Sequence, residues 1–81
     1  MRENEIAKVI VDCAYKIYMR YGPGLLESVY TTILAYELNK CGLEVEHEKT
    51  CFVIHDGIKL DQAFRIDLLV AEKVLVEVKA V

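Results

Sequence analysis

The stretch AFRIDLLVAEKVLVEVKAV, residues 63–81, holds two apolar runs separated by three residues. Each run has strand length and is rich in valine, leucine and isoleucine, so we predict β-strands over 63–70 and 74–80. The three-residue connection favours an antiparallel hairpin in which Val70 lies opposite Val74. Charged side chains nevertheless interrupt both apolar runs, and their positions need an explanation.

The predicted register places these charges against one another. Counting outward from the loop puts Asp67 opposite Glu77 and Arg65 opposite Lys79, on one face of the hairpin. Like charges directly opposite each other destabilise a sheet. A two-residue loop would shift the pairing by one residue and place them on opposite faces.

Two explanations fit this pattern. An exposed sheet face would satisfy the charges through diagonal Asp67–Lys79 and Glu77–Arg65 ion pairs. A divalent cation would instead turn the repulsion between the two acids into attraction, since Mg²⁺ is held by one or two carboxylates and a substrate phosphate. Asp67 and Glu77 would then be metal ligands, with the main-chain carbonyl of Val78 as a further ligand. Lys79 could orient a metal-bound water or help to deprotonate it.

The rest of the chain predicts helices before strands. Apolar residues recur at three- and four-residue steps over 3–21, which indicates an amphipathic helix that the GPG of residues 22–24 ends. A second helix follows and ends near Gly42, and Asp56-Gly57 predicts a tight hairpin turn. We therefore expect one α+β domain over 1–81, with N-terminal helices packed on an antiparallel or mixed sheet of three or four strands.

Composition limits the environment and the partners. The 81 residues are 54% hydrophobic, which is high for a small domain, so we expect shared apolar surface, either in a homo-oligomer or in a longer natural domain. A net charge of −3 argues against tight electrostatic binding of nucleic acid. A charged amino terminus and the lack of a long apolar run predict a cytoplasmic protein without membrane contact. Cys13, Cys41 and Cys51 lack metal-site spacing and are expected to be reduced, mostly buried thiols.

Two motifs carry a resemblance to known families. Asp67 followed by Glu77-Val78-Lys79 resembles the D…(E/D)xK signature of the PD-(D/E)XK nuclease superfamily, although Ile66 stands where the superfamily's proline would be. Upstream, GLLESVY at residues 24–30 is similar to the defining stretch of the GxxExxY protein family. In this order and at this spacing, the two motifs make a resemblance that extends over almost the whole chain.

The resemblance implies a restriction-endonuclease-like core and Mg²⁺- or Mn²⁺-dependent hydrolysis of DNA or RNA. It implies a catalytic set of Glu27, Asp67, Glu77 and Lys79, and it matches Tyr30 to the family tyrosine without giving it a role. Similar proteins continue past the lysine into a further helix and strand. We therefore expect a partial domain whose closing strand lacks a neighbour and favours self-association, most simply as a homodimer.

Two functions remain open at this point. One is a metal-dependent nuclease, and the other is a non-catalytic binding or assembly module that keeps the nuclease fold. Glu27 has a structural alternative as well. If Gly24 were the N-cap of the second helix, Glu27 would stand at N3 and could return a hydrogen bond to the cap.

Overall fold

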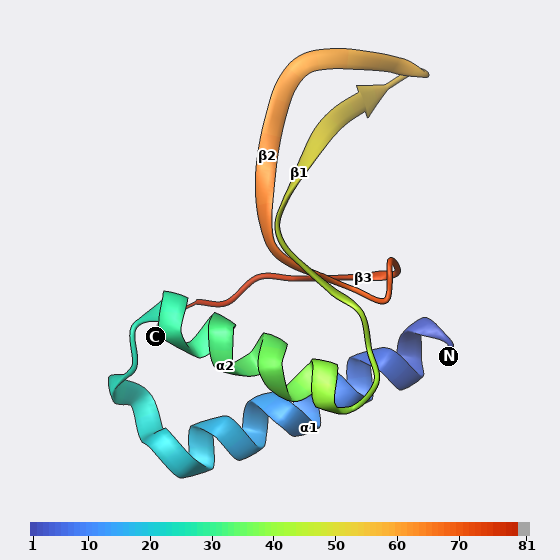
Figure 1. The fold of residues 1–81 in the computed structure, drawn as a ribbon. Helices are drawn as coiled ribbons and strands as arrows, with labels where there is room; N and C mark the ends of the chain where they lie inside the picture. Colours follow the sequence, from blue (N-terminus) through green and yellow to red (C-terminus); the bar gives the residue numbers. More distant parts are fainter. Residues whose placement is uncertain (80–81) are drawn as a thin grey trace.

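The computed structural model describes residues 1–79 and shows two helices on one side of a three-stranded antiparallel sheet (Figure 1). This arrangement confirms the predicted α+β class. The elements, in chain order, are α1 (Glu3–Tyr21), a 3₁₀ turn η1 (Gly22–Gly24), α2 (Glu27–Lys40), β1 (Val45–His55), β2 (Ile58–Val70) and β3 (Val74–Val76). Within the described chain, no helix is long and apolar enough to cross a membrane.

Helix α1 has the predicted bounds, and both of its ends have local causes. The Arg2 N–H at the N-cap donates to the Glu5 carboxylate at 2.9 Å, and acidic residues in the first turn favour the helix dipole. The helix ends at Tyr21, and the C-cap residue that follows, Gly22, has a positive φ of 71°, which suits glycine. Ile6, Ile10 and Ile17 are its buried residues.

Helix α2 begins later than the capping alternative required. Pro23 lies in the 3₁₀ turn, Leu25 is extended, and Leu26 is the N-cap, so Glu27 is the first helical residue. The interpretation with Gly24 as N-cap and Glu27 at N3 is therefore wrong. The physical reason is that Gly22–Gly24 form their own turn and need two further residues to redirect the chain.

The core lies between the helices and the lower part of the sheet. Its buried members come from both helices, the connection after α2, and β2: Ile6, Ile10, Ile17, Leu34, Ala35, Leu38, Leu43, Leu68 and Val70. Three valines after the last turn, Val74, Val76 and Val78, are partly buried against it, whereas the residues between them are exposed. This alternation confirms the predicted apolar face of residues 74–79.

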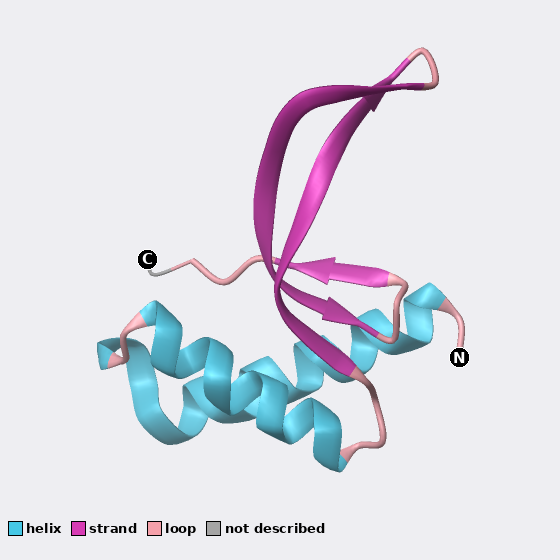
Figure 2. Ribbon diagram, turned by 45° about the horizontal axis from the view of Figure 1, so that its top comes forward, coloured by secondary structure: helices cyan, strands magenta, loops and turns pink. Residues whose placement is uncertain are grey.

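The sheet has the order β1-β2-β3, and its first hairpin forms a long arm that extends away from the helices (Figures 1 and 2). The turn at Asp56-Gly57 has φ values of 52° and 73°, so the predicted tight turn is confirmed. The run predicted over 63–70 is the second half of β2. A bulge between Phe52 and Ile54 shifts the register inside the arm.

The second hairpin follows the predicted register but is shorter. Val70 pairs with Val74 and Leu68 with Val76, and β3 ends there instead of continuing to residue 80, which lies outside the described residues. The ladder therefore stops before the predicted Asp67–Glu77 pair.

The charged side chains find other partners than those predicted. The Val78 N–H donates to the Asp67 carboxylate at 2.7 Å, while Arg65 pairs with Glu48 at 3.3 Å and Glu77 with Lys79 at 3.7 Å. Opposed like charges would repel, and these contacts avoid that repulsion. The predicted facing pairs and the predicted diagonal ion pairs are both wrong for the described chain.

The cysteines match their prediction in part. All three thiols are free, as expected. Cys13 and Cys51 are half-buried and Cys41 is exposed, so the expectation of mostly buried thiols is wrong. Cys41 is exposed because it caps the C-terminus of α2, where the chain turns at the surface.

Candidate active site

Two hollows adjoin at the start of α2, and Glu27 lines both of them. The first has a volume of about 350 Å³ and is lined by Tyr18, Gly22, Pro23, Leu25, Glu27, Tyr30, Val78 and Lys79. The second has a volume of about 390 Å³ and is lined by Glu27, Ser28, Thr31, Thr32, His47, Glu48 and Asp67. The structure thus brings four of the five predicted site residues to one place, namely Glu27, Asp67, Val78 and Lys79.

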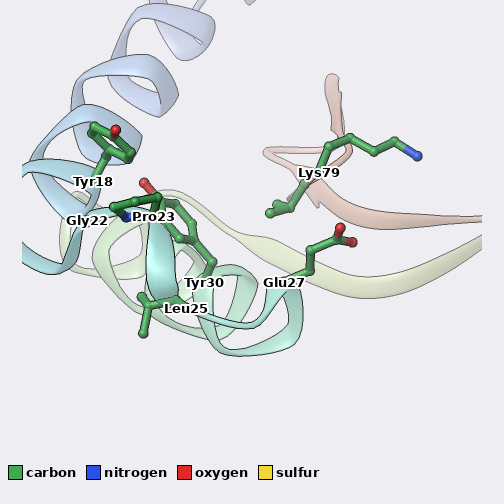
Figure 3. Close-up of a pocket in the computed structure, with 8 residues that line it drawn as sticks. Tyr18, Gly22, Pro23, Leu25, Glu27, Tyr30 and Lys79 are labelled. Atoms are coloured by element: carbon green, nitrogen blue, oxygen red, sulfur yellow. The ribbon is translucent and has the colours of Figure 1, made fainter. Parts of the chain in front are cut away.

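Glu27 takes its position from the start of α2. The N-terminus of a helix carries unpaired N–H groups and a partial positive charge, which favour a carboxylate there. In Figure 3 the Glu27 carboxylate points toward the segment that carries Lys79, and the aromatic side chains of Tyr18 and Tyr30 lie to the other side. The first hollow therefore has a charged end and an apolar end.

Asp67 connects β2 to the segment after β3. Its side chain is half-buried and accepts the Val78 N–H at 2.7 Å, in place of the backbone carbonyl that a longer ladder would have offered. The remaining lone pairs of a carboxylate can still bind a cation or a further donor. This hydrogen bond ties the segment after β3 to β2, and Figure 1 shows that segment running toward the start of α2. Val78 and Lys79 of this segment line the first hollow together with Glu27.

Glu77 stands apart from the other predicted ligands. It lines neither hollow, and its carboxylate pairs with the exposed Lys79 ammonium at 3.7 Å, a distance typical of a weak surface ion pair. Across residues 1–79, no three His, Cys, Asp or Glu side chains come close enough together to hold a metal ion. The full ligand set predicted from the sequence is therefore not assembled in this conformation.

The donor chemistry nevertheless suits a hard divalent cation. Glu27 and Asp67 offer carboxylate oxygens in the same hollow. Mg²⁺ needs only one or two carboxylates when waters and a substrate phosphate complete its shell. The residues present therefore fit such an ion.

The structure adds His47 and Glu48 to the candidate site, which the sequence analysis did not include. Both line the second hollow beside Asp67. Glu48 has a positive φ of 51°, which non-glycine residues rarely adopt, and the β1–β2 ladder is interrupted at this residue. Such local strain is most frequent at functional sites. The signal that could have found Glu48 is the register, which places it across from Asp67.

Comparison with known proteins identifies the family of this chain. A family model of the PD-(D/E)XK nuclease superfamily matches residues 4–81. The chain belongs to that superfamily. No significant match exists among curated proteins or among solved structures. Nucleases of the PD-(D/E)XK superfamily usually use divalent metals, in keeping with the carboxylates of the second hollow.

Tyr30 links the two helices of this PD-(D/E)XK domain. Its hydroxyl donates to the main-chain carbonyl of Ala14 at 2.8 Å and so ties α2 to α1 beside the first hollow. Burial raises the pKa of the Tyr30 phenol above its ordinary value, and the nearby Tyr18 raises that pKa further. The phenol is thus held in its neutral, donating form.

We expect Tyr30→Phe to lower the free energy of unfolding by about 1 kcal/mol, because one hydrogen bond is lost. Since the folded-state pKa is raised, the contribution of Tyr30 is present below the ordinary phenol pKa of about 10 and is lost as the pH rises through the folded-state value. Thermal unfolding at neutral and alkaline pH would show a smaller alkaline loss in Tyr30→Phe than in wild type. Tyr15→Phe, on the exposed side of α1, is the control, and equal alkaline losses in all three proteins would contradict this role.

Proposed function

We propose that this protein is a Mg²⁺- or Mn²⁺-dependent nuclease that hydrolyses phosphodiester bonds of DNA or RNA, and that it belongs to the GxxExxY group of its superfamily. The observation that supports this most is the meeting of Asp67, Glu27 and Lys79 at two adjoining hollows, with Glu27 common to both. These residues come from α2, β2 and the segment after β3, which are distant in sequence. Core packing alone does not require acidic and basic side chains to converge in this way.

The proposed roles follow from the position of each group. In hydrolysis, a water oxygen forms a bond to phosphorus, a P–O bond breaks, and the leaving oxygen takes up a proton. Asp67 and Glu77, with the Val78 carbonyl, would hold the metal, which supplies charge stabilisation and a more acidic water. Lys79 would orient the attacking water and balance the negative charge that develops on the phosphate. Glu27 would be the third acid.

Assembly of that set needs one local change. Glu77 has to leave its exposed ion pair with Lys79 and turn toward Asp67. An exposed pair of this kind contributes little stability, typically below about 1 kcal/mol, so a bound cation and phosphate would easily displace it. The same change would release the Lys79 ammonium toward the substrate.

The second candidate function is a non-catalytic binding or assembly module. The Glu77–Lys79 ion pair favours it, because that contact draws one proposed ligand away from the hollows within the described chain. Such a module would bind nucleic acid or protein without needing a metal.

A cleavage assay separates the two functions. Single-stranded DNA, duplex DNA and RNA would each be incubated with the protein in Mg²⁺, in Mn²⁺ or in EDTA. The nuclease proposal expects cleavage that requires metal and that Glu27→Gln lowers strongly. Binding of the same nucleic acids in EDTA, with no cleavage under any metal condition, would instead support the module.

We also propose a cytoplasmic location. The three free thiols suit a reducing compartment, because disulfides form mainly in oxidising ones. Fractionation of cells that express the tagged protein would test the proposal.

A further inference from the structure

The first hollow has an apolar end to which the proposed hydrolysis gives no role. The side chains that line this end come from α1, α2 and the connection between the two helices: Tyr18, Pro23, Leu25 and Tyr30. In Figure 3 they lie together on one side of the hollow, whereas Glu27 and Lys79 lie on the other. A ligand that fills the whole hollow is therefore apolar at one end and charged at the other.

The walls of the apolar end are already in place without a ligand. The half-buried Tyr30 donates its hydroxyl to the Ala14 carbonyl at 2.8 Å, and Pro23 lies in the 3₁₀ turn with the fixed φ of its ring. Tyr18 differs, because 50% of its surface is exposed. A preformed wall keeps the ordering cost of binding small, and the exposed part of the Tyr18 ring is surface that a ligand can cover.

A nucleotide has both the size and the chemistry of this hollow. The volume of about 350 Å³ falls in the range of about 300–1,000 Å³ that is typical of small-molecule pockets. A nucleotide joins a flat base to a charged phosphate through a sugar. Aromatic rings stack on bases of any sequence, and an ammonium such as that of Lys79 attracts phosphate. The two ends of the hollow therefore match the two ends of a nucleotide.

We propose that the apolar end of the first hollow is a subsite for one unpaired nucleobase, which stacks on Tyr18, and that the substrate is single-stranded nucleic acid. This inference rests on the proposed function, because it places the phosphate of the same nucleotide at Lys79. A base inside a duplex is stacked between its neighbours and reaches a pocket only after it leaves the helix. A single strand presents its bases without that cost.

The charge of the chain also favours a single strand. The net charge is −3, and among the described residues that line the first hollow Lys79 is the one cation. Affinity for a duplex depends mainly on many contacts between cations and phosphates. Stacking of a base on an aromatic ring contributes affinity without a further cation. An acidic protein with an aromatic subsite therefore suits a single strand better than a duplex.

The fluorescence of a 2-aminopurine base tests the subsite in EDTA, where no metal-dependent cleavage occurs. One such base in a single-stranded run of thymidines should lose emission when it stacks on Tyr18 of the full chain. We expect the dissociation constant to rise at least about fivefold in Tyr18→Ala and to stay near the wild-type value in Tyr18→Phe, which keeps the ring. Tyr36→Ala is the matched control, since Tyr36 is 62% exposed on α2 and lines neither hollow. Circular dichroism checks that all variants fold.

Changes in the nucleic acid test the same subsite without a substitution. An abasic strand of equal length keeps the phosphates but has no bases, so competition with the labelled strand should show binding at least about fivefold weaker than that of the normal strand. A duplex of the same length should also compete more weakly, because its bases are paired.

Three outcomes would overturn the subsite. They are an emission that wild type does not change, equal affinities of Tyr18→Ala and Tyr36→Ala, and equal competition by the normal and abasic strands. Cleavage distinguishes this failure from failure of the proposed function. Metal-dependent cleavage of duplex and single strand at equal rates, unchanged in Tyr18→Ala, would keep the nuclease and refute the subsite. Binding that depends on Tyr18, with no cleavage in any metal, would keep the subsite and refute the nuclease.

Discussion

Replacing Lys79 with alanine should lower the rate of metal-dependent cleavage by about 100-fold or more, because a cation placed where charge develops in the transition state has effects of that size. Lys79 lines the first hollow next to Glu27. Its only described ion pair is the weak one with Glu77, so the substitution should leave the melting temperature nearly unchanged. Single-turnover cleavage at saturating Mg²⁺ or Mn²⁺ would measure the loss.

Lys73→Ala is the matched control for this experiment. Lys73 lies in the loop before β3, lines neither hollow, and donates to the Met1 carbonyl at 2.7 Å. It should cleave at the wild-type rate. If Lys79→Ala cleaves as fast as Lys73→Ala, Lys79 does not act on the phosphate and the proposed mechanism is wrong.

Replacing Asp67 should have the largest effect on stability among the site residues. Asp67→Ala removes the acceptor of the Val78 N–H, and a hydrogen bond to a charged group contributes about 1.5–3 kcal/mol. We expect the metal-free melting temperature to fall by about 6 °C or more, given a shift of 4–8 °C per kcal/mol in a domain of this size. Thermal unfolding in EDTA measures this directly.

The response of the melting temperature to metal should distinguish wild type from Asp67→Asn. Wild type should gain about 1.4 kcal/mol at ~10 mM metal if the dissociation constant is ~1 mM, since the ion binds only the folded chain. Asp67→Asn keeps an oxygen that can accept the Val78 N–H but lacks the charge, so it should stay closer to wild type in EDTA and lose the response to metal.

Asp61→Ala removes an exposed aspartate of β2 and is the control for metal that binds away from the candidate site. It should respond to Mg²⁺ and Mn²⁺ as wild type does, at matched ionic strength. A wild type that melts at the same temperature in EDTA and in metal would argue against a metal site at Asp67. An Asp67→Asn variant that still responds would place the ion on other residues.

Much of the fold is readable from the sequence where local rules decide it. The helix over Glu3–Tyr21, the turn at Asp56-Gly57 and the Val70–Val74 register depend on apolar spacing, glycine and loop length, and all three are confirmed. The start of α2 was harder to predict, because a glycine three residues before a glutamate resembles an N-cap with its N3 acid. Only the 3₁₀ geometry of Gly22–Gly24 excludes that interpretation.

The residues of the candidate site were easier to predict from the sequence than the contacts that they make. The motifs named Glu27, Asp67 and Lys79, and the fold places these residues at adjoining hollows. Strand alternation also placed Glu77 and Lys79 together on the face opposite the valines, and the structure shows that this face is exposed. It could not show that β3 ends at Val76, because that end depends on the Asp67 carboxylate competing for the Val78 N–H.

The strand order has a consequence for how this chain folds. Neighbouring elements along the chain are also neighbours in space, since α1 packs on α2, β1 pairs with β2, and β2 pairs with β3. Contacts between nearby segments close short loops, and proteins rich in them fold quickly. The contact of α1 with β3 joins the two ends of the described chain and has the largest loop to close. Collapse of the two hairpins should therefore come first, and the segment that carries Lys79 should reach its place beside α2 last.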